Sequence, residues 1–259
     1  MKISDPVLEP LFAKILDRFF LCKTRLKPAF TDFYDPAKWT TFLNIIQHKY
    51  KSENIQALTF GGTADCERRM LGFFPFTDTT LLTSFPIKRL RISHNTKFNK
   101  GPRHQDYLGS ILGLGFDRGK IGDIFLMPES GYADVFVYDD IAEYICGQLD
   151  KVGKVPVKVQ ESPEDGPQLT HTETESQINV ASLRLDVIAA AIFRLSRGQI
   201  SALIGAEKVF VNWTPCTDKG KQIKLGDMVT VRGHGRARIG EVLGNTKKGR
   251  LRVTVFSAK

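Results

Sequence analysis

The spacing of apolar residues predicts two helices near the start of the chain. Apolar side chains recur every three or four positions across 8–20, and the preceding Asp5-Pro6 dipeptide favours a helix start. The same spacing recurs across 39–46, after Asp35-Pro36. Strand-like residues follow at 55–60, and 67–74 lead toward a second strand. The pattern therefore predicts an N-terminal α+β domain, residues 1–84.

From Ile87 onward, strand and helix patterns alternate in the order βαββαβ. Strands are expected at 87–93, 121–126, 132–138 and 155–159, and helices at 104–114 and after Asp139-Asp140. Ferredoxin-like folds and RNA-recognition domains share this order. It predicts such a middle domain at 85–160, within an α+β fold class overall. Phe136 lies where an RNA-recognition domain stacks bases, but 87–92 offers no aromatic partner, which favours a core position for Phe136.

The last third of the chain is expected to be a small domain joined by a linker. Residues 161–180 are polar, acidic and broken by prolines, which is typical of a linker. In the domain itself, 181–259, Ser182 and Ser196 are expected to cap two short helices, and Gly205 to end the second in a left-handed turn. Strands are expected at 209–211, 228–232, 239–243 and 251–256.

Positive charge is concentrated in this last domain. From Arg184 onward there are 15 Lys and Arg against 5 Asp and Glu, whereas the rest of the chain has 22 against 23. The formal net charge of +9 therefore resides in the last domain. A basic block on one domain is what nucleic-acid binding requires, since each phosphate contact needs a cation.

Basic residues on or beside the two short helices are the candidate ligands of phosphate. Arginine can form paired hydrogen bonds to a phosphate, and the N-terminus of a helix presents free N–H groups. The candidate RNA-binding residues are Arg184, Arg194, Ser196, Arg197, Gln199, Lys208, Asn212, Lys221 and Arg232. A solvated helix surface is the alternative interpretation of the same charges.

The sequence gives little support for a metal site, a cofactor or a membrane segment. The four cysteines are widely spaced, which indicates a reducing compartment and argues against a zinc site. We expect no cofactor, no metal and no transmembrane segment, and a monomer in the cytoplasm. A plastid stroma is the alternative location if a transit peptide has been removed.

Several spaced residues of the last domain resemble the S4-type RNA-binding domain, also called the alpha-L fold. They are Arg184-Leu-Asp186, Ser196-Arg197, Ile204-Gly205, Val209 to Asn212, Lys221 and Leu225-Gly-Asp227. The resemblance implies a helix-helix-sheet domain, here with a β-hairpin extension, that binds structured RNA through its helical face.

A second resemblance spans nearly the whole chain. Its residues are Phe30-Thr-Asp-Phe33, Asp35-Pro36, Phe60-Gly-Gly62, Glu67-Arg-Arg69, His104-Gln-Asp-Tyr-Leu-Gly109, Leu112-Gly-Leu-Gly115, Arg118 and Ile121-Gly-Asp-Ile124. Together they resemble the YlmH family, including its photosynthetic branch, the photosystem II S4 domain protein. Family membership implies a non-catalytic role on the large ribosomal subunit, near ribosomal RNA and tRNA, in ribosome-associated quality control.

Two other classes of function remain as alternatives. One is an RNA-modifying enzyme of the pseudouridine synthase type, but such an enzyme needs a much larger catalytic domain, usually after the S4-type domain. His104 and Asp106 lie close enough in sequence to be tested as an acid–base pair, although a carboxylate there more simply stabilises a helix start. The other is a photosystem II assembly or structural factor, which rests on the family name alone.

Overall fold

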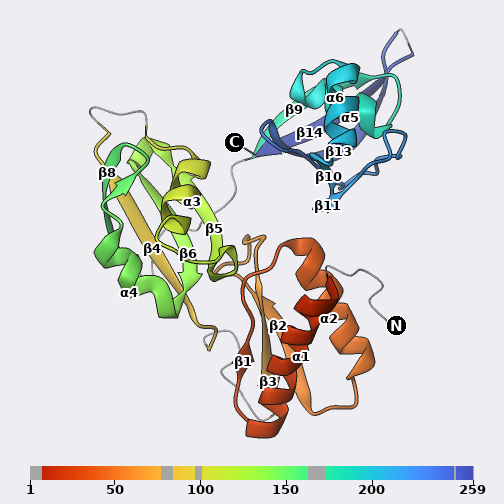
Figure 1. Cartoon of the computed structure of the whole chain (residues 1–259). Helices are drawn as coiled ribbons and strands as arrows, with labels where there is room; N and C mark the ends of the chain where they lie inside the picture. The colour runs from red at the N-terminus through yellow and green to blue at the C-terminus, as the bar shows by residue number, and fades with distance from the viewer. Residues whose placement is uncertain (1–7, 77–83, 97–100, 163–172, 248, 259) are drawn as a thin grey trace. The chain divides into compact units, whose positions relative to one another are not determined.

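Two compact units make up the chain, Met1–Thr170 and His171–Lys259 (Figure 1). The computed structural model describes residues 8–76, 84–96, 101–162, 173–247 and 249–258. Two expected features lie outside the described residues, namely the helix start at Asp5-Pro6 and the proline-broken part of the linker at 163–172.

Two helices and a three-stranded sheet form the N-terminal domain. They are α1 (Leu8–Arg25), β1 (Ala29–Phe30), α2 (Pro36–Lys49), β2 (Ile55–Phe60) and β3 (Met70–Pro75), with sheet order β1-β3-β2. Asp35 begins α2 as predicted, because its carboxylate accepts a hydrogen bond from the backbone N–H of Lys38 at 3.0 Å. The apolar stripes of both helices meet the sheet in one core that contains Phe19, Phe42 and Phe73.

The middle domain has the predicted βαββαβ order. Its elements are β4 (Ile87–His94), α3 (His104–Leu112), η1 (Arg118–Lys120), β5 (Ile121–Met127), η2 (Pro128–Ser130), β6 (Tyr132–Tyr138), α4 (Asp139–Gln148), β7 (Lys151–Val152) and β8 (Val155–Glu161). The sheet order is β5-β6-β4-β8-β7 and every pairing is antiparallel, which is the ferredoxin-like arrangement.

Alternation along the central strands divides the two faces of this sheet. Leu90 and Val135 point to the core that α3 and α4 cover. Arg91 follows Leu90 on β4, and Asp134 precedes Val135 on β6. Both therefore lie on the opposite face of the sheet. That second face is the one on which RNA-recognition domains stack bases, so what covers it decides whether this domain works in the same way.

The C-terminal unit packs two short helices on one face of a six-stranded sheet. Its elements are β9 (Glu173–Val180), α5 (Leu185–Phe193), α6 (Arg197–Gly205), β10 (Val209–Val211), β11 (Thr214–Pro215), β12 (Met228–Val231), β13 (Gly235–Asn245) and β14 (Leu251–Ala258). The order is β11-β10-β12-β13-β14-β9. Ile188 and Ile200, from the two helices, are fully buried against Val231 of the sheet. Burial of an isoleucine contributes about 1.5–3 kcal/mol to folding.

The structure differs from the expected linker at residues 173–180. They form β9, which pairs antiparallel with β14 from Glu173 opposite Ala258 to Val180 opposite Leu251. Their polar composition is typical of a linker, but an edge strand tolerates polar residues when a distant segment supplies its hydrogen bonds. The first element of the C-terminal unit is consequently a strand of its sheet, β9, and not the helix α5.

The first helix of this unit begins later than the sequence pattern predicts. Arg184, not Ser182, is the residue before α5. The backbone N–H of Leu185 donates to the carbonyl of Lys221 at 2.9 Å, so a distant loop, and no serine cap, satisfies the start of the helix.

The second helix ends differently from the prediction as well. Gly205 stays helical and is the last residue of α6. Glu207 instead takes the left-handed conformation, with φ 54°. Lys208 N–H then donates to the Leu203 carbonyl at 2.9 Å and Glu207 N–H to the Ile204 carbonyl at 3.0 Å, the two hydrogen bonds of a Schellman turn.

The left-handed residue gives a prediction about stability. Glu207→Gly should stabilise the C-terminal unit by about 1 kcal/mol, because glycine adopts positive φ without a steric penalty from Cβ. Glu207→Ala is the matched control and should give no such gain, since alanine retains Cβ. Urea unfolding of the full chain measures both changes. An equal gain in the two variants would show that the side chain of Glu207, and not its backbone angle, limits stability.

Candidate RNA-binding surface

The starts of the two helices meet at a buried carboxylate, that of Asp186. Its side chain is 4% exposed, and its Oδ1 atom accepts a hydrogen bond from Nε of Arg184 at 3.1 Å. Oδ2 accepts a hydrogen bond from Nη2 of Arg197, which comes from the first turn of α6. One carboxylate therefore holds an arginine from each helix start, and Arg184, Asp186 and Arg197 are called the arginine clamp below.

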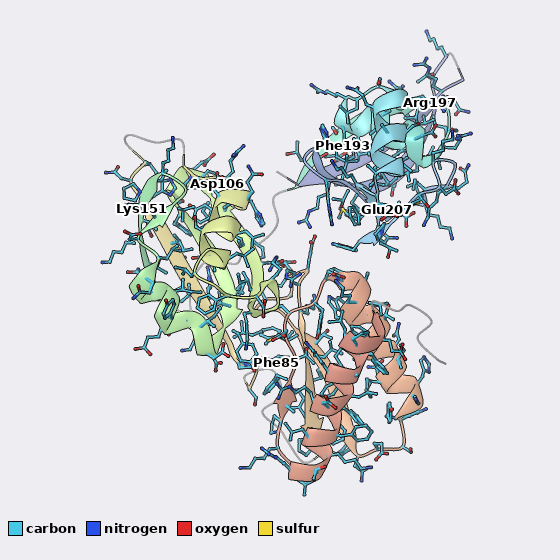
Figure 2. The ribbon with its side chains drawn as sticks, in the orientation of Figure 1. Phe85, Asp106, Lys151, Phe193, Arg197 and Glu207 are labelled. Carbon is cyan, nitrogen blue, oxygen red and sulfur yellow. The ribbon has the colours of Figure 1, made fainter. Side chains whose placement is uncertain are left out.

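Electrostatics keeps this carboxylate ionised. Burial acts to raise the pKa of Asp186, but hydrogen bonds and positive charge from Arg197 and Arg184 outweigh burial and leave the pKa below its usual range. The arginines remain available on their outer side, because the side chain of Arg197 is 62% exposed and that of Arg184 is 40% exposed. Figure 2 labels Arg197 at the start of α6. Two guanidinium groups are thus fixed in position and still face solvent.

A basic loop is tied to the same place. The backbone N–H groups of Leu185 and Asp186 donate to the carbonyls of Lys221 and Lys219, at 2.9 Å and 3.2 Å. Both lysines are exposed. The structure therefore brings three of the predicted residues together, Arg184, Arg197 and Lys221, and adds Lys219, which lies two residues before Lys221 in the sequence.

Two other predicted residues serve the helix itself. Ser196 and Gln199 form a capping box: Ser196 Oγ accepts from the backbone N–H of Gln199 at 3.2 Å, and Gln199 Oε1 accepts from the N–H of Ser196 at 2.8 Å. Arg194 is exposed and occupies the left-handed position between the helices, with φ 55°. The side chains of Ser196 and Gln199 thus stabilise the start of α6.

The remaining predicted residues lie beyond the other end of α6. Lys208 accepts a hydrogen bond on its carbonyl from the N–H of Arg232 at 2.9 Å, and both residues are exposed. Helix α6 runs from Arg197 of the arginine clamp to Gly205, three residues before Lys208, and spans roughly 12 Å at the usual helical rise. Asn212 supports a tight turn, in which its side chain donates to Asp227 and accepts from the N–H of Met228, each at 2.9 Å.

On the face of the middle-domain sheet opposite α3 and α4, the position of Phe136 is covered. Phe136 is 3% exposed and packs with Cys66 and Phe125. The turn at Gly62 approaches so closely that a Cβ atom there would lie 2.3 Å from the Phe136 ring. A core position for Phe136, which the sequence favours, is the one the structure shows.

Buried polar contacts fasten this cover. Asp123 accepts hydrogen bonds from the backbone N–H groups of Glu67 and Arg68, the latter at 3.2 Å. The guanidinium of Arg68 donates to the carbonyls of Phe33 and Ile121, at 2.7 Å and 3.0 Å. Burial lowers the pKa of Arg68 despite the nearby Asp123 carboxylate. The N-terminal and middle domains are therefore joined by a specific network across this face.

The rest of the same face is occupied by an ion cluster. Asp134 is fully buried between Arg89 and Arg91, at 2.6 Å and 2.9 Å. The Arg91 guanidinium lies 3.9 Å from the centre of the Tyr132 ring and so covers it. The likeness of this domain to RNA-recognition domains is thus one of fold: on this face Phe125 and Phe136 are buried, and the partly buried rings of Tyr132 and Tyr138 lie beside Arg91 and Lys120.

The possible acid–base pair at the start of α3 has a structural explanation. Asp106 accepts hydrogen bonds from the backbone N–H of Arg103 at 2.9 Å and from its side chain, as part of a capping box. These contacts, chiefly the backbone hydrogen bond, lower the pKa of Asp106. A carboxylate with a lowered pKa is a poor proton donor near neutral pH, as expected of a residue that stabilises a helix start.

Comparisons with known proteins agree with this arrangement. Residues 82–165 match a family model described as a putative RNA-binding domain in YlmH, and residues 183–229 match the S4 domain model. The ribosome-associated protein quality control protein P2 of Bacillus subtilis (strain 168) is 30% identical over 226 residues, 86% of this chain and 85% of the relative. The arginine clamp and the Lys219–Lys221 loop lie within the S4 match.

A solved structure shows the same fold in part. The cell division protein ylmH from Streptococcus pneumoniae superimposes with a TM-score of 0.52 and 20% identity, over 63% of this chain and 95% of that chain. At this identity the likeness concerns the fold alone. Within the described residues, no single helix is long and apolar enough to cross a membrane, and α5 and α6 pass that test only as a pair bent by 115°. The described residues also include no group of three potential metal ligands.

The covered sheet face yields a prediction about folding. Gly62→Ala should destabilise the first unit by about 2–4 kcal/mol, because the new Cβ would meet the Phe136 ring and φ at this position is 109°. Gly147→Ala is the matched control within α4, where a Cβ meets no atom within 4 Å. It should be neutral or slightly stabilising. Thermal unfolding measures both; a neutral Gly62→Ala would mean that the two domains do not pack in this way.

The arginine clamp yields a prediction about affinity. Asp186→Asn should weaken binding to a stem-loop RNA several-fold at moderate salt, although it removes a negative charge, because the two guanidinium groups lose the carboxylate that positions them. Glu241→Gln, on exposed β13, removes the same charge away from the clamp and should bind equally or slightly more tightly. Fluorescence anisotropy measures both affinities. If Asp186→Asn bound the RNA more tightly than the wild type, Asp186 would only reduce the positive charge of the arginines, and the positioning role would be wrong.

Proposed function

Because the chain belongs to the YlmH family, we propose that it binds structured RNA of the large ribosomal subunit, ribosomal RNA or tRNA, as a non-catalytic factor in ribosome-associated quality control. The name of the Bacillus subtilis relative supports the ribosomal setting. The two RNA-binding family matches support RNA as the ligand. We place this role in the cytoplasm, with the chain acting as a monomer.

The arginine clamp is the observation that carries the proposal. Two guanidinium groups are held by one carboxylate, and each keeps an exposed side on which a phosphate can be bound with paired hydrogen bonds. Holding the arginines in place before binding lowers the entropy lost when RNA binds. The exposed lysines at 219 and 221 extend the positive surface along the start of α5.

The chemistry of the clamp favours binding over catalysis. A pseudouridine synthase requires a reactive aspartate, whereas both oxygens of Asp186 accept hydrogen bonds from arginines and its pKa lies below the usual range. A carboxylate in this state is a weak base and is shielded from a substrate. We therefore assign it a positioning role. The first unit, whose sheet face is occupied internally, would orient the C-terminal unit or contact other ribosomal components.

Sedimentation with ribosomal subunits tests the proposal. Replacing both arginines alone would leave Asp186 buried without a partner, which typically costs about 3–5 kcal/mol, so the test variant neutralises the whole clamp: Arg184→Gln, Asp186→Asn and Arg197→Gln together. The wild-type chain should migrate with large subunits at low salt. The triple variant should dissociate at lower salt, with a dependence on salt that reflects about two fewer phosphate contacts.

The control is Lys151→Gln, which changes the net charge by the same amount in the first unit (Figure 2). It should sediment like the wild type. Circular dichroism should show that the triple variant is folded. A wild-type chain that stays at the top of the gradient at every salt concentration would contradict the ribosomal assignment, and a triple variant that sediments like the control would contradict the role of the clamp.

A further inference from the structure

The face of the C-terminal sheet opposite the helices carries aromatic and basic residues in register. Val209, Val231 and Ile239 point to the helices, so their strand neighbours lie on the other face. One row across that face is Phe210, Thr230 and Arg236, and the next is Met228, Arg238, Phe256 and Glu175. These two rows, with Arg232, are called the open sheet face below.

Each aromatic ring on this face is paired with an arginine. The guanidinium of Arg232 lies 4.8 Å from the centre of the Phe210 ring, and that of Arg238 lies 4.3 Å from the centre of the Phe256 ring. Both rings are only partly buried. Such pairs provide flat surfaces on which a base can stack, together with a cation beside each for the phosphate backbone.

The backbone beneath helps to fix one of these rings. A Cβ atom on Gly240 would lie 2.8 Å from Cε2 of Phe256, so the glycine allows the ring to lie close to β13. Thr254, its neighbour on the same face of β14, is 6% exposed. The Phe256 ring is therefore held at a defined position on the sheet, which a stacking platform requires.

Charge favours nucleic acid over other occupants of this face. On the face opposite the helices, the register places Arg236, Arg238 and Arg252, with Arg232 at the edge, and these four arginines outnumber the acidic positions of Glu173 and Glu175. A protein partner would be expected to meet a more balanced mixture of charges. The partly exposed rings suit unpaired bases, because bases inside a duplex present only their edges.

We infer that the open sheet face is a second RNA-binding site, which binds an unpaired RNA segment by stacking bases on Phe210 and Phe256. The inference rests on the proposed function in that RNA is the ligand, but it concerns a different surface. Structured RNA is bound at the arginine clamp on the helical side, and the unpaired segment on the opposite side of the same sheet. The domain would thereby recognise a helix and an adjacent loop together.

Fluorescence of 2-aminopurine measures stacking directly. The probe is a single-stranded oligouridine with one 2-aminopurine, and the test variant is Phe210→Leu with Phe256→Leu, which leaves every charge in place. Wild-type protein should quench the probe. The variant should lose most of the quench and bind at least about tenfold more weakly, because stacking accounts for much of the affinity for each base. Phe20→Leu, on exposed α1, is the control and should quench like the wild type.

Several outcomes distinguish this inference from the proposed function. Undiminished quenching by the leucine variant, or no quenching by the wild type, overturns the inference even if the chain still sediments with large subunits. Loss of quenching in the variant supports it even if the chain fails to sediment with them. Should the leucine variant misfold, Arg232→Gln with Arg238→Gln keeps both rings and should weaken probe binding several-fold while bound probe stays quenched; unchanged affinity would overturn the inference.

Discussion

A buried carboxylate must be compensated by positive charge or by hydrogen bonds, and in the C-terminal unit this constraint shapes the candidate RNA-binding surface. Asp186 satisfies it with Arg184 and Arg197, one from each helix start. Its own backbone N–H and that of Leu185 are satisfied by the loop of residues 219–221. Folding of the domain therefore positions the two arginines, because they supply the side-chain hydrogen bonds of the Asp186 carboxylate within the described residues.

Buried carboxylates of the middle domain are also compensated by arginines and backbone N–H groups, but there the contacts cover a sheet face. Asp134 is buried between two arginines and Asp123 accepts backbone N–H groups from the N-terminal domain, and together these contacts close the sheet face. In the C-terminal unit the face opposite the helices carries Phe210 and Phe256, each partly buried beside an arginine. The two sheets thus differ in that the turn at Gly62 buries Phe136 of the first, whereas Phe210 and Phe256 of the second are only partly buried.

Local patterns predicted most of the elements and fewer of the site residues. Helical spacing, the cap at Asp35 and the βαββαβ order predicted the helices and the longer strands of the first unit, because these signals lie within short segments, whereas the two-residue strands β1 and β7 were missed. Strand β9 was missed because its partner β14 lies more than seventy residues away in the sequence. Ser196 caps its helix as predicted, with Gln199 three residues away, whereas the contact of Asn212 with the backbone of Met228 depends on a turn that only the folded chain forms. The sequence signal for Asp186 was present in Arg184-Leu-Asp186, although a role in positioning requires Arg197 as well.

The central claim is that RNA contacts the arginine clamp, and the most direct test maps RNA contacts on the wild-type chain. Ultraviolet irradiation of wild-type protein bound to large ribosomal subunits, followed by mass spectrometry of the cross-linked peptides, locates those contacts without any substitution. We expect cross-links in peptides from 184–199 and 217–224, which carry the arginine clamp and its basic loop. Cross-links confined to β4 and β6 of the middle domain would contradict this expectation, because they would require the covered sheet face to open and bind RNA in place of the C-terminal unit.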